Sequence, residues 1–174
     1  MEKVITWDMD KTIADLYNYP NWLEFLQNEQ TDPYDFCKPL MNCHEFYNTL
    51  NALRNRGWRM EIISWSSKGG SKAYNKKVKQ AKVNWLKANG IYDCFDSVHV
   101  VKYGTKKHRV AKNVSILIDD DAKVRTEWLA HGGMVLDPTK NDIITALLSW
   151  MDEDECPRLF CYSWVNKIGT SPFS

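Results

Sequence analysis

Short apolar runs that alternate with amphipathic segments constrain the fold of this chain more than any other feature. Runs of this kind predict strands, and they lie at residues 4–7, 58–65, 98–101, 114–118 and 134–136. Strands that alternate with helices favour right-handed βαβ crossovers and a parallel sheet with helices on both faces. We therefore predict an α/β fold with a Rossmann-like three-layer α/β/α parallel sheet.

Amphipathic segments separate the predicted strands. Asn42 is placed to cap a helix that Gly57 ends, and further helices are expected at residues 74–88, 122–131 and 142–151. In the helix at 74–88 the apolar residues of the buried side are Val78, Ala81, Trp85 and Leu86. The same part of the chain carries seven lysines and no acid: Lys68, Lys72, Lys76, Lys77, Lys79, Lys82 and Lys87. We interpret most of these lysines as a solvated helix face.

The length of 174 residues predicts a single domain. We expect the core to comprise residues 1–151, with 15–41 as a candidate small cap insertion and 152–174 as a C-terminal arm packed on the core. The net charge of +1 gives no general attraction to nucleic acid or membranes. The chain has no apolar stretch of bilayer length, and its five cysteines lack the paired spacing of a zinc site. A cytoplasmic protein with reduced thiols is the expectation.

Acidic residues directly follow the first and the fourth predicted strand. Asp8 and Asp10 come after the first strand, and Asp119 and Asp120 come after the fourth. Parallel strands deliver their last residues to the carboxyl edge of the sheet, where ligands of open α/β sheets bind. Carboxylates gathered there repel one another unless a cation lies between them. Oxygen ligands beside a phosphate suit Mg²⁺, so these residues predict a magnesium site.

The same carboxylates are suited to covalent phosphoryl transfer. Asp8 at the end of a strand can attack phosphorus, because carboxylates are nucleophiles toward phosphoryl groups. Asp10 could protonate the leaving oxygen and then take a proton from the water that cleaves the intermediate. Mg²⁺ would reduce the repulsion between the nucleophile and the phosphate.

Four motifs in this order resemble those of the haloacid-dehalogenase-like phosphohydrolases, over roughly residues 1–150. The motifs are Asp8-x-Asp10-x-Thr12, Ser66, a lysine near residue 106 and Ile118-Asp119-Asp120. The resemblance implies that Asp8 is the nucleophile and Asp10 the acid and base. It also implies that the metal is held by the Asp8 carboxylate, the backbone carbonyl of Asp10 and Asp119. The family usually has glycine where this chain has Lys11.

Hydroxyl residues after the second strand match the family position that binds the phosphoryl oxygens. Ser66, with its neighbour Ser67, fits the junction between strand and loop, and Ser64 is the alternative. Trp22 and Trp65 lie in segments expected at the mouth of the site. Their rings could stack on a base or a sugar of the substrate, although simple packing also explains them.

A lysine of the family stabilises the charge around the nucleophile and the phosphate. Lys102, Lys106 and Lys107 all lie in the matching region. We prefer Lys106 for this catalytic and substrate-binding role, because Gly104-Thr105 would let it begin a short helix before the fourth strand.

Together these residues predict a Mg²⁺-dependent phosphatase that hydrolyses a phosphomonoester through an aspartyl-phosphate on Asp8. A small cap would leave the site open to a nucleotide, a phosphorylated nucleic-acid end or a sugar phosphate, and we favour a nucleotide. The sequence does not distinguish a 3′ from a 5′ phosphate. The alternatives are a phosphoacceptor signalling module and a non-catalytic binding protein that keeps the acidic pocket. A signalling domain would carry its phosphorylated aspartate after a middle strand, which differs from the order found here.

Overall fold

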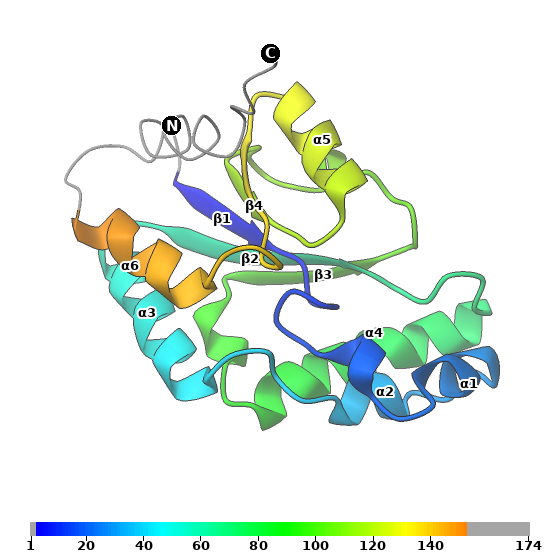
Figure 1. The fold of residues 1–174 in the computed structure, drawn as a ribbon. Coiled ribbons are helices and arrows are strands. Elements are labelled where there is room, and N and C mark those ends of the chain that lie inside the picture. Colours follow the sequence, from blue (N-terminus) through cyan, green and yellow to red (C-terminus); the bar gives the residue numbers. More distant parts are fainter. Residues whose placement is uncertain (1–2, 153–174) are drawn as a thin grey trace, which may run out of the picture.

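A single parallel sheet of five strands forms the centre of the computed structural model, which describes residues 3–152 (Figure 1). The strands are β1 (Val4–Trp7), β2 (Arg59–Trp65), β3 (Ser97–Val101), β4 (Ile116–Ile118) and β5 (Met134–Leu136). Their order across the sheet is β3-β2-β1-β4-β5, and every neighbouring pair is parallel. The predicted α/β class and the parallel sheet are therefore confirmed.

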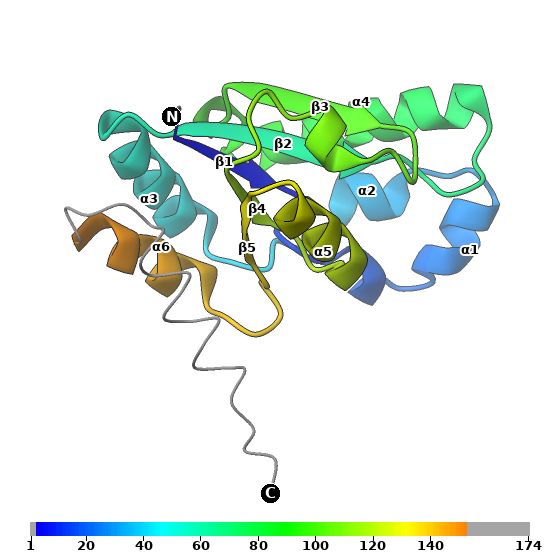
Figure 2. The same cartoon turned by 90° about the horizontal axis from the view of Figure 1, so that it is seen from above.

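Helices cover both faces of this sheet (Figures 1 and 2). On one face lies α5 (Ala122–Ala130), where Val124 and Trp128 pack against Leu117 of β4. The other face is covered by α3 (Cys43–Asn55), α4 (Lys72–Ala88) and α6 (Ile143–Asp152). Apolar side chains of these three helices share one core cluster with β1, β2 and β4. Burial of this apolar surface is the main force that holds the layers together.

Residues 15–41, the candidate cap insertion, form short helical elements beside α4 (Figure 2). These elements are η1 (Leu16–Asn18), α1 (Trp22–Gln27) and α2 (Asp32–Phe36). Leu16 and Tyr34 are buried against Tyr74 and Val78 of α4. The segment is therefore fixed on the core, next to the loop that follows β1.

Side-chain caps define where the helices begin. The Asn42 side chain accepts hydrogen bonds from the backbone N–H groups of His44 and Glu45, at 3.0 and 3.1 Å, and so caps α3 as predicted. Asp121 caps α5 in the same way, through Lys123 N–H at 2.8 Å. Two 3₁₀ turns, η2 (Tyr92–Cys94) and η3 (Lys107–Arg109), flank β3.

Among the described residues, no helix has the length and the apolar character needed to cross a membrane. The predicted C-terminal arm lies outside the described residues, apart from Asp152 at the end of α6.

Candidate active site

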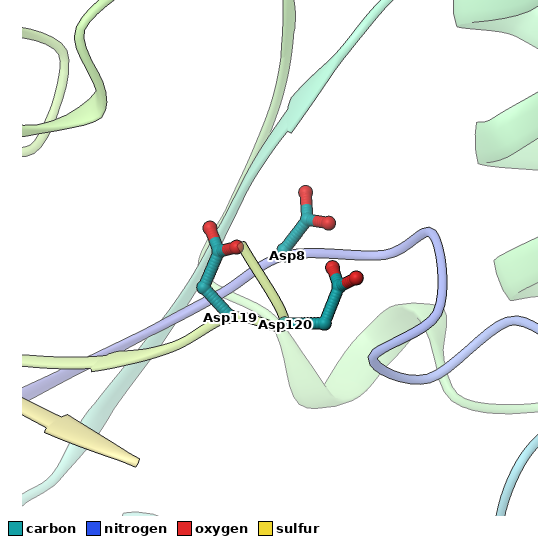
Figure 3. A group of neighbouring side chains, drawn as sticks. All are labelled: Asp8, Asp119 and Asp120. Atoms are coloured by element: carbon teal, nitrogen blue, oxygen red, sulfur yellow. The ribbon is translucent and has the colours of Figure 1, made fainter. Parts of the chain in front are cut away.

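The register of the sheet brings the two acidic segments together. Trp7 of β1 is paired with Ile118 of β4, and the Asp8 backbone N–H donates to the Ile118 carbonyl oxygen at 2.9 Å. The next residue of each strand is an aspartate, so Asp8 and Asp119 leave the sheet side by side. Carboxylate oxygens of Asp8, Asp119 and Asp120 lie within 4.8 Å of one another (Figure 3). The predicted convergence of carboxylates at this edge is therefore present.

A tight turn after β1 returns Asp10 to the same cavity. The Met9 carbonyl oxygen accepts hydrogen bonds from the N–H groups of Thr12, Ile13 and Ala14 at 3.1, 2.9 and 2.9 Å. Lys11 has a φ of 58°, in the left-handed region that favours glycine. This conformation gives a physical reason for glycine at the position, and here a lysine adopts it.

Lys107 is the lysine that reaches the carboxylates. Its ammonium donates to Asp8 Oδ1 and to Asp119 Oδ2, at 2.7 Å each, and its side chain is 2% exposed. Lys106 is exposed instead, with its Nζ 3.8 Å from Glu127 of α5. The preference for Lys106 is therefore corrected to Lys107. The turn η3 begins one residue later than predicted, which leaves Lys106 in extended backbone and directs it away from the cavity.

A second buried lysine, Lys82 of α4, also belongs to the site. Its ammonium donates to Asp10 Oδ2 at 2.7 Å, to Ser64 Oγ at 2.9 Å and to the Trp65 carbonyl oxygen at 2.9 Å. Lys82 was not among the predicted site residues, because the lysines of this segment were interpreted as a solvated helix face. One signal was available: Lys82 follows Ala81 and precedes Trp85, within the apolar stripe of the helix.

The serines at the end of β2 have different surroundings. Ser64 is fully buried and is bonded to Lys82. Ser66 and Ser67 line the cavity that contains Asp8, and the Ser66 N–H is held by the Val101 carbonyl oxygen at 2.7 Å. Ser66 and Ser67 therefore line the cavity and Ser64 does not, while the binding of a phosphate by the two serines stays a prediction.

The cavity has a volume of about 470 Å³ and two chemically different parts. One part holds the carboxylates, Lys107 and the two serines. The other part is largely aromatic and apolar, with side chains from η1, α1, α2, the end of β2 and the loop after β3: Leu16, Tyr17, Trp22, Leu23, Leu26, Tyr34, Trp65 and Tyr103. Gln27 and Lys68 are polar residues that also line the cavity. Within this part Tyr17 packs against Trp22, and Trp65 packs against Tyr103, each pair with ring centroids 4.9 Å apart. Trp65 is also held by a hydrogen bond from its Nε1 to the Thr105 carbonyl oxygen at 2.8 Å.

Burial and repulsion by the charge of Asp8 raise the pKa values of three carboxyl groups, those of Asp10, Asp119 and Asp120. The pKa of Asp119 is raised to about 7 by burial and by the charge of Asp8, against the opposing attraction of Lys107. The pKa of Asp120 is raised to about 6 by burial and by Asp8. Burial also raises the pKa of Asp10, although Lys82 opposes that shift. Burial alone would lower the pKa of Lys107, but Asp8 and Asp119 raise it, so this lysine remains charged.

The charges fit a divalent cation. Carboxylates of Asp8, Asp10, Asp119 and Asp120 face two buried ammonium groups, one from Lys82 and one from Lys107. The exposed Lys11 lies 4.0 Å from Asp120, where solvent screens its charge. With all four carboxyl groups ionised, these oxygen donors carry an excess of two negative charges over the buried lysines, which matches the requirements of Mg²⁺. Asp8, Asp119 and Asp120 are the residues placed to hold such an ion.

These features were compared with known proteins. No protein-family model matches the chain, and no curated protein is significantly similar to it.

Proposed function

We propose that this chain is a Mg²⁺-dependent phosphatase of the haloacid-dehalogenase-like kind, with a small cap formed by residues 15–41. The observation that supports this most directly is the contact of Lys107 with both Asp8 and Asp119, at 2.7 Å each, beside Asp120. A phosphoryl group next to Asp8 would meet a carboxylate nucleophile, a buried cation and the hydroxyls of Ser66 and Ser67. This combination serves attack on phosphorus better than it serves simple structural stability, because carboxylates buried together destabilise the fold.

Asp8 forms the new bond in the proposed reaction. One of its oxygens attacks phosphorus, the bond from phosphorus to the leaving oxygen breaks, and Asp10 gives that oxygen a proton. Water then attacks the phosphoryl group on Asp8, Asp10 takes a proton from the water, and Asp8 returns as a free carboxylate. Lys107 stabilises the negative charge that Asp8 shares with the phosphoryl oxygens. Mg²⁺, when bound by Asp8, Asp119, Asp120 and the Asp10 carbonyl, would screen the phosphate charge from these carboxylates.

The aromatic part of the cavity favours a nucleotide, free or at the phosphorylated end of a nucleic acid. Flat bases stack on aromatic rings, and each such contact contributes about 1–3 kcal/mol. A sugar phosphate has many hydroxyls, and besides Gln27, Lys68 and the tyrosine hydroxyls the side chains of this part offer them few hydrogen-bond partners. The cavity volume of about 470 Å³ lies in the range of sites for small organic ligands.

Release of inorganic phosphate tests the reaction. With Mg²⁺ present, we expect turnover of p-nitrophenyl phosphate that Asp8→Asn removes and that Asp10→Asn reduces. Asp93→Asn, at an exposed aspartate far along the chain from both motifs, is the matched control and should keep the wild-type rate. Absence of any turnover that depends on Asp8 would overturn the proposal. A long-lived aspartyl-phosphate without turnover would favour the phosphoacceptor module.

A substrate panel tests the nucleotide. We expect Trp22→Leu to lower the ratio of kcat/KM for a nucleoside monophosphate to that for ribose 5-phosphate by about tenfold, through lost stacking. Phe36→Leu is the control, because Phe36 lies in the same segment, is 69% exposed and is not among the residues that line the cavity. An equal ratio in wild type and Trp22→Leu would contradict the nucleotide while leaving the phosphatase intact. Free nucleotides and phosphorylated oligonucleotides in the same panel distinguish the two forms.

A further inference from the structure

We infer that Lys82 is a positioning residue that orients the Asp10 carboxyl group for proton transfer to the leaving oxygen. The inference rests on the proposed phosphatase function. It adds a residue on α4, remote in sequence from all the acidic motifs, to the machinery of the reaction.

The Lys82 ammonium is itself held in one place. An ammonium has three donors, and here three oxygen atoms accept from it: Asp10 Oδ2, Ser64 Oγ and the Trp65 carbonyl oxygen. The side chain is 1% exposed, and its Nζ lies 5.2 Å from the centroid of the Tyr34 ring. A lysine with every donor used and no access to solvent has little freedom to move.

Only one oxygen of Asp10 is engaged by this contact. Oδ2 is bound to Lys82, whereas Oδ1 makes no hydrogen bond to any described residue. The Asp10 side chain is 18% exposed and lines the cavity that contains Asp8. Anchoring one oxygen fixes the plane of the carboxyl group, so the other oxygen is left available at the cavity.

The position of Lys82 argues against a purely packing role. It lies in the apolar stripe of α4 between Ala81 and Trp85, where an apolar side chain would fill the space without desolvating a charge. Burying an ammonium there ties the loop after β1 to the end of β2 and to α4. Such an arrangement anchors the Asp10 carboxyl group to a helix and a strand, and catalysis requires a fixed geometry of this kind.

Leaving-group dependence tests this role. p-Nitrophenolate leaves without a proton, whereas the alkoxide of a nucleoside monophosphate needs one. We expect Lys82→Met to lower kcat/KM for the nucleotide by about 100-fold and that for p-nitrophenyl phosphate by less than about fivefold, in proportion to the contribution of general acids. kcat/KM is the informative parameter, because it reports the step in which the leaving oxygen departs.

Two comparisons separate positioning from general damage. Asp10→Asn should give the same leaving-group pattern, and adding Lys82→Met to it should cause little further loss, because both changes remove one function. Lys79→Met, at an exposed lysine of the same helix, should match wild type with both substrates. If Lys82→Met does not fold, Ser64→Ala loosens the same ammonium without leaving a charge unpaired and should show a weaker form of the pattern.

Equal losses with both substrates, or losses that add in the double variant, would overturn this inference while the phosphatase proposal stands. Failure of the phosphatase itself has a different signature, namely no turnover of either substrate that depends on Asp8 in the wild-type protein.

Discussion

Two buried lysines meet the carboxylates of this molecule in different ways. Lys107 bridges two carboxylates, Asp8 and Asp119, which directly follow the neighbouring strands β1 and β4. Lys82 contacts a single carboxylate, Asp10, and completes its hydrogen bonds with two uncharged oxygens. The first arrangement places a cation where negative charge accumulates, and the second fixes the direction of one side chain.

The difference shows that a buried lysine can stabilise negative charge in one region and orient a carboxyl group in another. Removing Lys107 leaves two adjacent carboxylates without a shared cation, so the main consequence is repulsion at the reacting atoms. Removing Lys82 leaves one carboxylate and two neutral groups without a donor, so the main consequence is loss of order and of stability.

Lys107→Met should reduce kcat/KM for p-nitrophenyl phosphate by about 100- to 1,000-fold, because it removes a preorganised cation beside the nucleophile. Steady-state kinetics with Mg²⁺ measure this loss. Lys106→Met, one residue earlier and exposed, should retain the wild-type value. A large loss with Lys106→Met and none with Lys107→Met would reverse the assignment of the catalytic lysine.

Lys82→Met should lower the free energy of unfolding by about 3 kcal/mol, because it leaves the partly buried Asp10 without its cation. Urea denaturation at pH 8, where an unpaired carboxyl group is most costly, measures the change. Adding Asp10→Asn should restore part of the stability, since both charges are then absent. No recovery in the double variant would mean that the pair is not the source of the loss.

Mg²⁺ should stabilise the protein at pH 8 by about 1.4 kcal/mol when present at ten times its Kd, and by less at pH 5. The sign follows from the carboxyl groups, because the pKa values of Asp119 and Asp120 are raised to about 7 and about 6. The metal-free fold therefore loses stability as pH rises from the ordinary aspartate range to about 7. Below the raised pKa values of about 6 and about 7, protons on Asp120 and Asp119 compete with the ion. Thermal unfolding with and without Mg²⁺ at both pH values measures the effect.

Stabilisation by Mg²⁺ should also differ between the Lys107 and Lys82 regions. Asp119→Asn should remove most of the Mg²⁺ stabilisation, whereas Lys82→Met should leave the increment unchanged, because Lys82 contacts none of the three clustered carboxylates. If Mg²⁺ stabilised wild type and Asp119→Asn equally, the ion would bind elsewhere.

Local signals in the sequence were sufficient to predict the α/β class and the parallel sheet. Apolar runs gave the five strands, and the cap at Asn42 gave the start of α3. The carboxylates at Asp8 and Asp119 could be brought together from sequence alone, because parallel strands end at a common edge. The predicted start of η3 was one residue too early, and this shift changed which lysine enters the cavity.

Alternating strands and helices, with acids after the first and the fourth strand, determined the sheet and the place of its acidic cluster. Tertiary structure alone decided which cations meet those acids, since Lys82 and Lys107 come from elements 72 and 99 residues away from their partners Asp10 and Asp8. The physical reason is that strand and helix patterns depend on neighbours in sequence, whereas the burial of a charge depends on everything packed around it. A lysine in an otherwise basic segment gives no local sign of the carboxylate that it will meet.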